Sequence, residues 1–175
     1  MRGLTAGPDP GDEAVDIVDA AGRTIGVTTR RDMRARKLAH RSVYVLVFDR
    51  RGRLFIHLRV PTKDVHPGHW DVAVGGVLAA GESFDAAARR EAAEELGVAL
   101  EPEPLFPVRY TDSSTDVHGM AYRATHDGPF RLQREEIVRG EFVPLDAVAA
   151  RAARDPFCPD GLAVLAEYRR RAHPG

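Results

Sequence analysis

Three glutamates near the middle of the chain, Glu91, Glu94 and Glu95, have the spacing that places side chains on one face of a helix. Like charges at this spacing repel one another, so a helix built for stability alone would place cations among them. Carboxylate oxygens gathered in this way bind hard divalent cations such as Mg²⁺. The same spacing also fits a hydrated acidic surface, and the three residues alone leave both interpretations open.

The residues around the glutamates favour a metal site. Gly75 and Gly76 lie between an apolar run and a loop, where glycine permits a close backbone approach and leaves a carbonyl free to face the site. Glu82 precedes the expected helix and is well placed to pair with Arg90 across a folded-back loop. Such a pair would hold the loop against the helix, so one loop–helix unit would contain every part of a rigid acidic site.

Residues 76–98 resemble the Nudix box, which reads Gly-x5-Glu-x7-Arg-Glu-U-x-Glu-Glu-x-Gly-U, with U an apolar residue. Every specified position matches, and Ala92 is the smallest side chain at an apolar position. A full match by chance in a chain of this length is on the order of one in a million for average composition. The order of the expected strands and helices extends the resemblance to about residues 43–171.

The resemblance implies roles for the matching residues. Glu91, Glu94 and Glu95 are expected to bind Mg²⁺ or Mn²⁺, with one of them also acting as general base. The carbonyl of Gly76 is expected to add a ligand. Glu82 and Arg90 are expected to orient the catalytic helix.

Other expected site residues lie outside the box. The family often supplies one more acid from the region of a late strand, and Glu136 is preferred there over Glu135 and Glu141. Arg59 and Lys63 lie on the loop before the box and could bind substrate phosphates, although ordinary surface charge explains them equally well.

The reaction that the resemblance implies is hydrolysis of a diphosphate linkage in a nucleoside di- or triphosphate or a related organic diphosphate. The negative charges of a diphosphate repel a nucleophile, and divalent ions neutralise that charge. Positioning and electrostatics then dominate, which explains a fixed array of carboxylates in place of a nucleophilic side chain.

Three alternatives were weighed against hydrolysis. Residues 40–71 resemble the branch close to isopentenyl-diphosphate isomerase, and His40 matches one of the metal histidines of the isomerases. The isomerases, however, have a cysteine where this chain has Gly75 and a histidine where it has Val77. A non-catalytic nucleotide-sensing Nudix module would commonly lack box glutamates, and a messenger-RNA decapping enzyme would need a basic RNA-binding surface.

The elements that must position the box form a mixed set of strands and helices. We expect a hairpin over residues 15–27, strands at 42–48, 54–58, 71–78, 105–110, 119–125 and 141–145, and helices at 31–38, 83–96, 146–154 and 161–171. This order predicts an α+β fold with a mixed sheet, and the resemblance implies the family's α/β/α sandwich.

Bulk properties indicate an ordinary globular enzyme. The chain has 175 residues, a net charge of −1, 43% hydrophobic residues and a single cysteine, Cys158. We expect a disordered tail over 1–11 and one Nudix domain over 12–175, extended by the N-terminal hairpin and a basic helix whose charges form a solvated face. No nucleic acid or membrane partner is expected, the location is expected to be cytoplasmic, and a homodimer is compatible with the resemblance.

Overall fold

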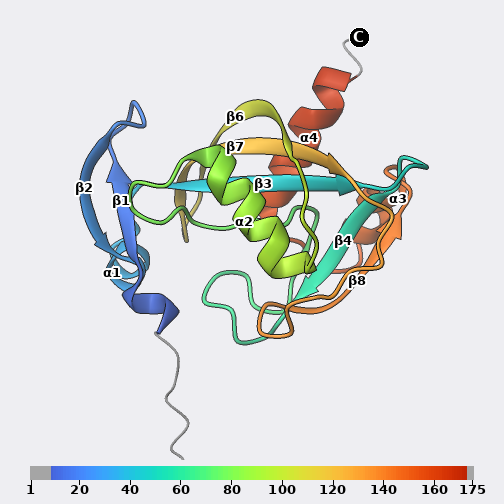
Figure 1. Ribbon diagram of the computed structural model, residues 1–175, viewed down its shortest axis with the longest axis horizontal. Helices are drawn as coiled ribbons and strands as arrows, with labels where there is room; N and C mark the ends of the chain where they lie inside the picture. Colours follow the sequence, from blue (N-terminus) through green and yellow to red (C-terminus); the bar gives the residue numbers. More distant parts are fainter. Residues whose placement is uncertain (1–8, 173–175) are drawn as a thin grey trace, which may run out of the picture.

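The structure is a computed structural model that describes residues 9–172, and it has a mixed eight-stranded sheet between helices (Figure 1). The strands are β1 (Ala14–Val18), β2 (Thr24–Thr29), β3 (His40–Phe48), β4 (Leu54–Arg59), β5 (Trp70–Asp71), β6 (Glu103–Thr111), β7 (Asp116–Thr125) and β8 (Ile137–Val143). The helices are the 3-10 turn η1 (Pro10–Asp12), α1 (Arg30–Ala35), α2 (Phe84–Leu96), α3 (Ala147–Ala152) and α4 (Pro159–Ala172). The predicted α+β sandwich is therefore confirmed.

Strand β3 is the centre of the sheet. It runs parallel to β7 along its whole length, and its antiparallel contacts with β1 and β4 lie at its two ends. β3 and β4 are consecutive strands joined by a short turn, but the two are paired only at Phe48 and Leu54. β4 continues instead alongside β8, and β6 completes the other side through β7.

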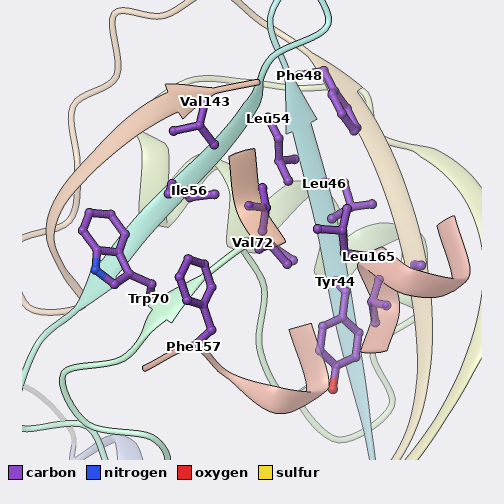
Figure 2. Packing of buried hydrophobic residues seen from close by; sticks show 14 of the residues in the cluster. Tyr44, Leu46, Phe48, Leu54, Ile56, Trp70, Val72, Val143, Phe157 and Leu165 are labelled. Atoms are coloured by element: carbon purple, nitrogen blue, oxygen red, sulfur yellow. The ribbon is translucent and has the colours of Figure 1, made fainter. Parts of the chain in front are cut away.

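The two faces of β3 are buried against different helices, because successive side chains of a strand point to opposite faces. Val43, Val45 and Val47 pack with the alanine-rich face of α2. Tyr44 and Leu46 pack on the other face with Phe157 and α4 (Figure 2). The nearly continuous apolar sequence of β3 reflects this burial on both faces.

The predicted strand over 71–78 is wrong in most of its length. β5 has only two residues, and Val74 and Val77 form isolated bridges to β3. Gly75 has a φ of 153°, and a Cβ there would overlap the carbonyl oxygen of Val43. This backbone turn at Gly75 interrupts the strand and leads the chain toward α2.

Several boundaries also differ from the predictions. β8 begins at Ile137 and ends before Pro144, whereas a strand over 141–145 was predicted. Residues 1–8 of the predicted tail lie outside the described residues, while Pro10–Asp12 form a 3-10 turn that Asp9 caps. No helix within residues 9–172 is long and apolar enough to cross a membrane.

Helix α2 has the caps that the sequence predicts. The Ser83 hydroxyl accepts a hydrogen bond from the Ala86 amide at 3.2 Å, and Gly97 ends the helix at a φ of 66°. The buried face of α2 carries small alanines together with Glu91 and Glu95. Two carboxylates are therefore held on the face that a helix normally keeps apolar.

Candidate active site

The loop before α2 is fastened to the helix by the predicted pair of Glu82 and Arg90. Arg90 donates from Nε and Nη2 to the two oxygens of Glu82, at 2.8 and 2.9 Å. Glu82 also accepts from the backbone amide of Ala79 at 3.0 Å. The bidentate pair fixes both distance and orientation, so the loop and the helix form one rigid unit.

Glu91 and Glu95 are the buried acids of this unit, with 8% and 6% of their surface exposed. Burial raises the pKa of Glu91, against the opposing charge of Arg90. Burial and the neighbouring charge of Glu91 raise the pKa of Glu95 to about 8. The two carboxylates therefore lie close enough to repel each other inside the protein.

Glu94 lies at the rim of the site. Its side chain is 51% exposed and accepts a hydrogen bond from Arg90 Nη1 at 3.2 Å. The same Arg90 nitrogen donates to Glu91 at 2.9 Å. Arg90 thus links the exposed Glu94 to the buried Glu91 through one nitrogen.

Gly76 lies directly against the Glu91 carboxylate. A Cβ at this position would lie 2.6 Å from Glu91 Oε1, so glycine is what permits the approach. The Gly76 carbonyl accepts a hydrogen bond from the Val43 amide at 3.0 Å, which leaves its second lone pair free.

The donor set fits a hard divalent cation, which prefers oxygen ligands. Two buried carboxylates repel each other, and a cation between them would relieve both the repulsion and the cost of burying charge. Within residues 9–172, no group of three His, Cys, Asp or Glu side chains is arranged to hold a metal ion in the observed rotamers. Arg90 Nη1 donates to Glu91 and Glu94 in this arrangement, so both carboxylates use an oxygen on the guanidinium.

A cavity opens beside Gly75 and Gly76, and Arg59 and Lys63 both line it. Their charges act on Glu95 and lower its pKa, although the larger effect of burial prevails. Lys63 forms an ion pair with Glu136, so the residue predicted from the late strand lies in the turn before β8 and faces this loop. The structure therefore brings Arg59, Lys63 and Glu136 to the side of the buried pair.

Several cavity residues were not predicted from the sequence. Tyr44, Asp71 and Asp160 come from β3, β5 and α4, and the Tyr44 hydroxyl donates to Asp160 at 3.0 Å. Burial and the charge of Asp160 raise the pKa of Asp71 to about 6. No spacing in the sequence relates these positions, because only the packing of α4 against the sheet brings them together.

The basic helix also differs from expectation. Its charges were predicted to form a solvated face, but Arg30 and Arg34 line the cavity, with side chains only 24% and 23% exposed. Cys158, the single cysteine of the chain, lines the same cavity. Burial raises the pKa of the Cys158 thiol and keeps it protonated.

Comparisons with known proteins agree with this fold and site. A family model described as the NUDIX domain matches residues 38–161. The Nudix hydrolase SCO1686 of Streptomyces coelicolor is 42% identical over 172 residues, which cover 97% of this chain and 93% of the relative. YfcD of Escherichia coli K12, also a Nudix hydrolase, is 38% identical over 91% of this chain and 88% of its own length.

Solved structures show the same architecture. DR0079 from Deinococcus radiodurans has a TM-score of 0.79 at 28% identity and covers 89% of this chain and 98% of its own. The NUDIX domain of Shewanella oneidensis NrtR, solved with ADP-ribose, has a TM-score of 0.61 at 19% identity. The match covers 83% of this chain and 100% of the NrtR domain. A mixed sheet with a clamped acidic helix defines the Nudix class of protein. This chain belongs to the Nudix family, and its class of activity is that of a Nudix hydrolase.

Proposed function

We propose that the protein hydrolyses a diphosphate linkage in a nucleoside di- or triphosphate or a related organic diphosphate, with Mg²⁺ or Mn²⁺ as cofactor. The observation that carries this proposal is the buried pair of Glu91 and Glu95 on a clamped helix, beside a cavity lined by cations. A buried pair of like charges is costly for stability. A divalent cation bound between the two carboxylates would offset that cost.

Glu91, Glu95 and the carbonyl of Gly76 would hold the cation, with Glu94 and Glu136 as further ligands from the rim. The cation supplies charge neutralisation on the diphosphate and acidifies water. One of the helix carboxylates takes the proton of the attacking water. The position of these carboxylates beside the cavity supports this role, because a general base must lie within reach of the water whose proton it takes.

Arg59 and Lys63 would bind the phosphate oxygens of the substrate. Each is held near the acidic helix by an acid, Arg59 by Asp71 at 3.8 Å and Lys63 by Glu136. Cations placed in this way orient the diphosphate and stabilise the charge that develops as the bond breaks. Glu82 and Arg90 act through the helix and keep the carboxylates in position.

The rival activities have less support. An isomerase with its cysteine at position 75 would need a side chain where a Cβ overlaps the carbonyl oxygen of Val43. A sensing module has no need of the full set of box glutamates, all of which are present.

The test is Glu95→Gln, which keeps the shape of the side chain and removes its charge. With Mg²⁺ we expect phosphate or pyrophosphate release to fall by about 100-fold or more. Mn²⁺ should raise the melting temperature of the wild type and not that of the variant, since binding to the native state stabilises it. Glu101→Gln, which changes an exposed acid, is the matched control.

The substrates for this test are nucleoside diphosphates and triphosphates, dinucleotides, sugar nucleotides and isopentenyl diphosphate. EDTA should abolish hydrolysis, and added Mg²⁺ should restore it. Wild-type turnover by Glu95→Gln would show that the metal assignment is wrong. Formation of the dimethylallyl isomer from isopentenyl diphosphate would overturn the hydrolase proposal.

A further inference from the structure

Helix α1 directs two of its arginines into the cavity. Arg30 and Arg34 are one turn apart and therefore share a face of the helix. Arg31, on another face, is 58% exposed and pairs with Asp9 and Asp12. The helix thus has a cavity side and a solvent side, and each side carries arginine.

The N-terminal hairpin holds α1 rigidly against the catalytic loop. Asp16 of β1 is 6% exposed, pairs with Arg41 and accepts from the Gly81 amide at 3.0 Å. The Ala80 amide donates to the carbonyl of Ala14 at 2.8 Å. Because Gly81 adjoins Glu82, β1 is fixed to the same loop that orients α2, and α1 packs on β1 through Met33 and Val15.

Arg34 is a buried cation with incomplete partners. Its Nε lies 3.5 Å from Asp64 and makes no hydrogen bond within the described part of the chain. Its remaining contact is a 3.4 Å hydrogen bond to the hydroxyl of Thr115. Arg90, in contrast, makes bonds of 2.8 and 2.9 Å to Glu82. Burial lowers the pKa of Arg34 against the opposing charge of Asp64, so a further anion near Arg34 would offset the cost of burying this cation.

The other cavity cations also lie beside acids, and the Nε atoms of Arg30 and Arg59, like that of Arg34, make no hydrogen bond among the described residues. Lys63 pairs with Glu136, Arg59 lies beside Asp71, and Arg30 donates to Glu13 at 2.5 Å. The diphosphate itself would be neutralised by the metal ion and by Arg59 and Lys63. Arg34 is therefore a further cavity cation, beyond the two that the proposed function assigns to the diphosphate.

The cavity wall near Arg34 is polar. His40 Nδ1 donates to the Leu38 carbonyl at 2.9 Å, so Nε2 is an acceptor, and it has no partner among the described residues. His66 Nε2 and Asp160 Oδ1 line the same cavity and are also without partners there. A polar organic group with donors and acceptors of its own fits such a wall better than a hydrocarbon chain.

We propose that Arg34, supported by Arg30, binds a second anionic group of the substrate, a phosphate or a carboxylate on the organic part away from the scissile diphosphate. This inference rests on the proposed function of the site and narrows its substrate class. The substrate is an organic diphosphate that carries a further oxyanion, and the N-terminal extension of the fold selects it.

The first test measures anion binding without catalysis. Inorganic phosphate is titrated calorimetrically into the protein in EDTA, with wild type, Arg34→Gln, Arg34→Lys and the solvent-side control Arg31→Gln. We expect Arg34→Gln to weaken phosphate binding about tenfold, and Arg34→Lys to retain part of the affinity. Arg31→Gln should match the wild type. Equal affinity in the wild type and Arg34→Gln would overturn the proposal.

The second test uses substrate pairs that differ by one remote anion. NADP⁺ with NAD⁺ and coenzyme A with its 3′-dephospho form test a phosphate, while UDP-glucuronate with UDP-glucose tests a carboxylate. We expect kcat/KM to favour the anionic member of at least one pair about tenfold, mostly through KM, and Arg34→Gln to lose this preference. Turnover without preference would overturn the second-anion proposal and leave the hydrolase intact. Absence of turnover would count against the hydrolase, and the titration would still decide on Arg34.

Discussion

Gly76 and Glu91 fit closely together in the candidate site. A buried carboxylate can approach the backbone here because position 76 has no side chain. The glycine of the box motif therefore has a steric role that can be separated from any role of its carbonyl.

Gly76→Ala should displace the Glu91 carboxylate, since the added methyl group would lie 2.6 Å from Oε1. We expect kcat for diphosphate hydrolysis to fall roughly 10- to 100-fold, because small displacements of catalytic groups are costly. The control is Gly26→Ala, whose methyl group would meet Ile17 at an ordinary 3.4 Å. Wild-type kcat in Gly76→Ala would show that the position of Glu91 does not matter for turnover.

At the scale of residues, local patterns could be predicted and tertiary neighbours could not. The pairing of Glu82 with Arg90 follows from a spacing that one helix and its preceding loop determine. Arg34, Asp71 and Asp160 come from three separate elements, and no sequence interval connects them. The basic sequence of α1 predicts a solvated surface. Only the tertiary structure shows that the side with Arg30 and Arg34 faces a cavity.

At the scale of elements, the sequence predicts a helix well where capping residues mark both of its ends. Ser83 and Gly97 bound α2, and the structure has the helix between them. The segment 71–78 has the apolar residues of a strand, but the backbone at Gly75 takes a conformation that ends it. A glycine within a strand pattern indicates such a break without giving its geometry.

The clamp between the catalytic loop and α2 should contribute measurably to stability. Glu82→Gln removes a charge-assisted bidentate pair in which Glu82 is only 15% exposed. We expect the free energy of unfolding to fall by about 2 kcal/mol, measured by urea denaturation, and kcat to fall with it. Glu101→Gln breaks the exposed pair with Arg89, so a change under about 0.5 kcal/mol is expected. Equal losses in the two variants would contradict a special role for the clamp.

At the scale of the whole molecule, the sheet separates two apolar layers, and the cavity opens beside β3 and the start of α4. Polar and acidic groups collect there, among them Asp71 and Asp160. Such groups reduce stability, because burial opposes their ionisation. The fold tolerates this loss of stability because a large apolar cluster lies on each side of the sheet, and Figure 2 shows one of the two.

The pH dependence of stability should reveal the cost at Asp71. Burial and the charge of Asp160 raise its pKa to about 6, against about 3.9 in an unfolded chain. Well below a pH of about 3.9 the carboxyl is protonated in both states and costs nothing. Between pH 4 and 6 the native state binds more protons than the unfolded state, so stability falls as pH rises, and the loss is complete above pH 6.

Asp71→Asn removes this ionisation and can still accept the hydrogen bond from the Val72 amide. We expect the variant to be more stable than the wild type by about 2 kcal/mol at pH 7.5 and equally stable at pH 4, measured by urea denaturation. Glu167→Gln is a control of opposite sign, because hydrogen bonds from Arg170 and Arg171 lower the pKa of Glu167 to about 2. Glu167→Gln should therefore be less stable than the wild type at pH 7.5. A gain for Asp71→Asn that is the same at both pH values would mean that the ionisation of Asp71 is not its cause, and the stabilisation would then have to come from packing.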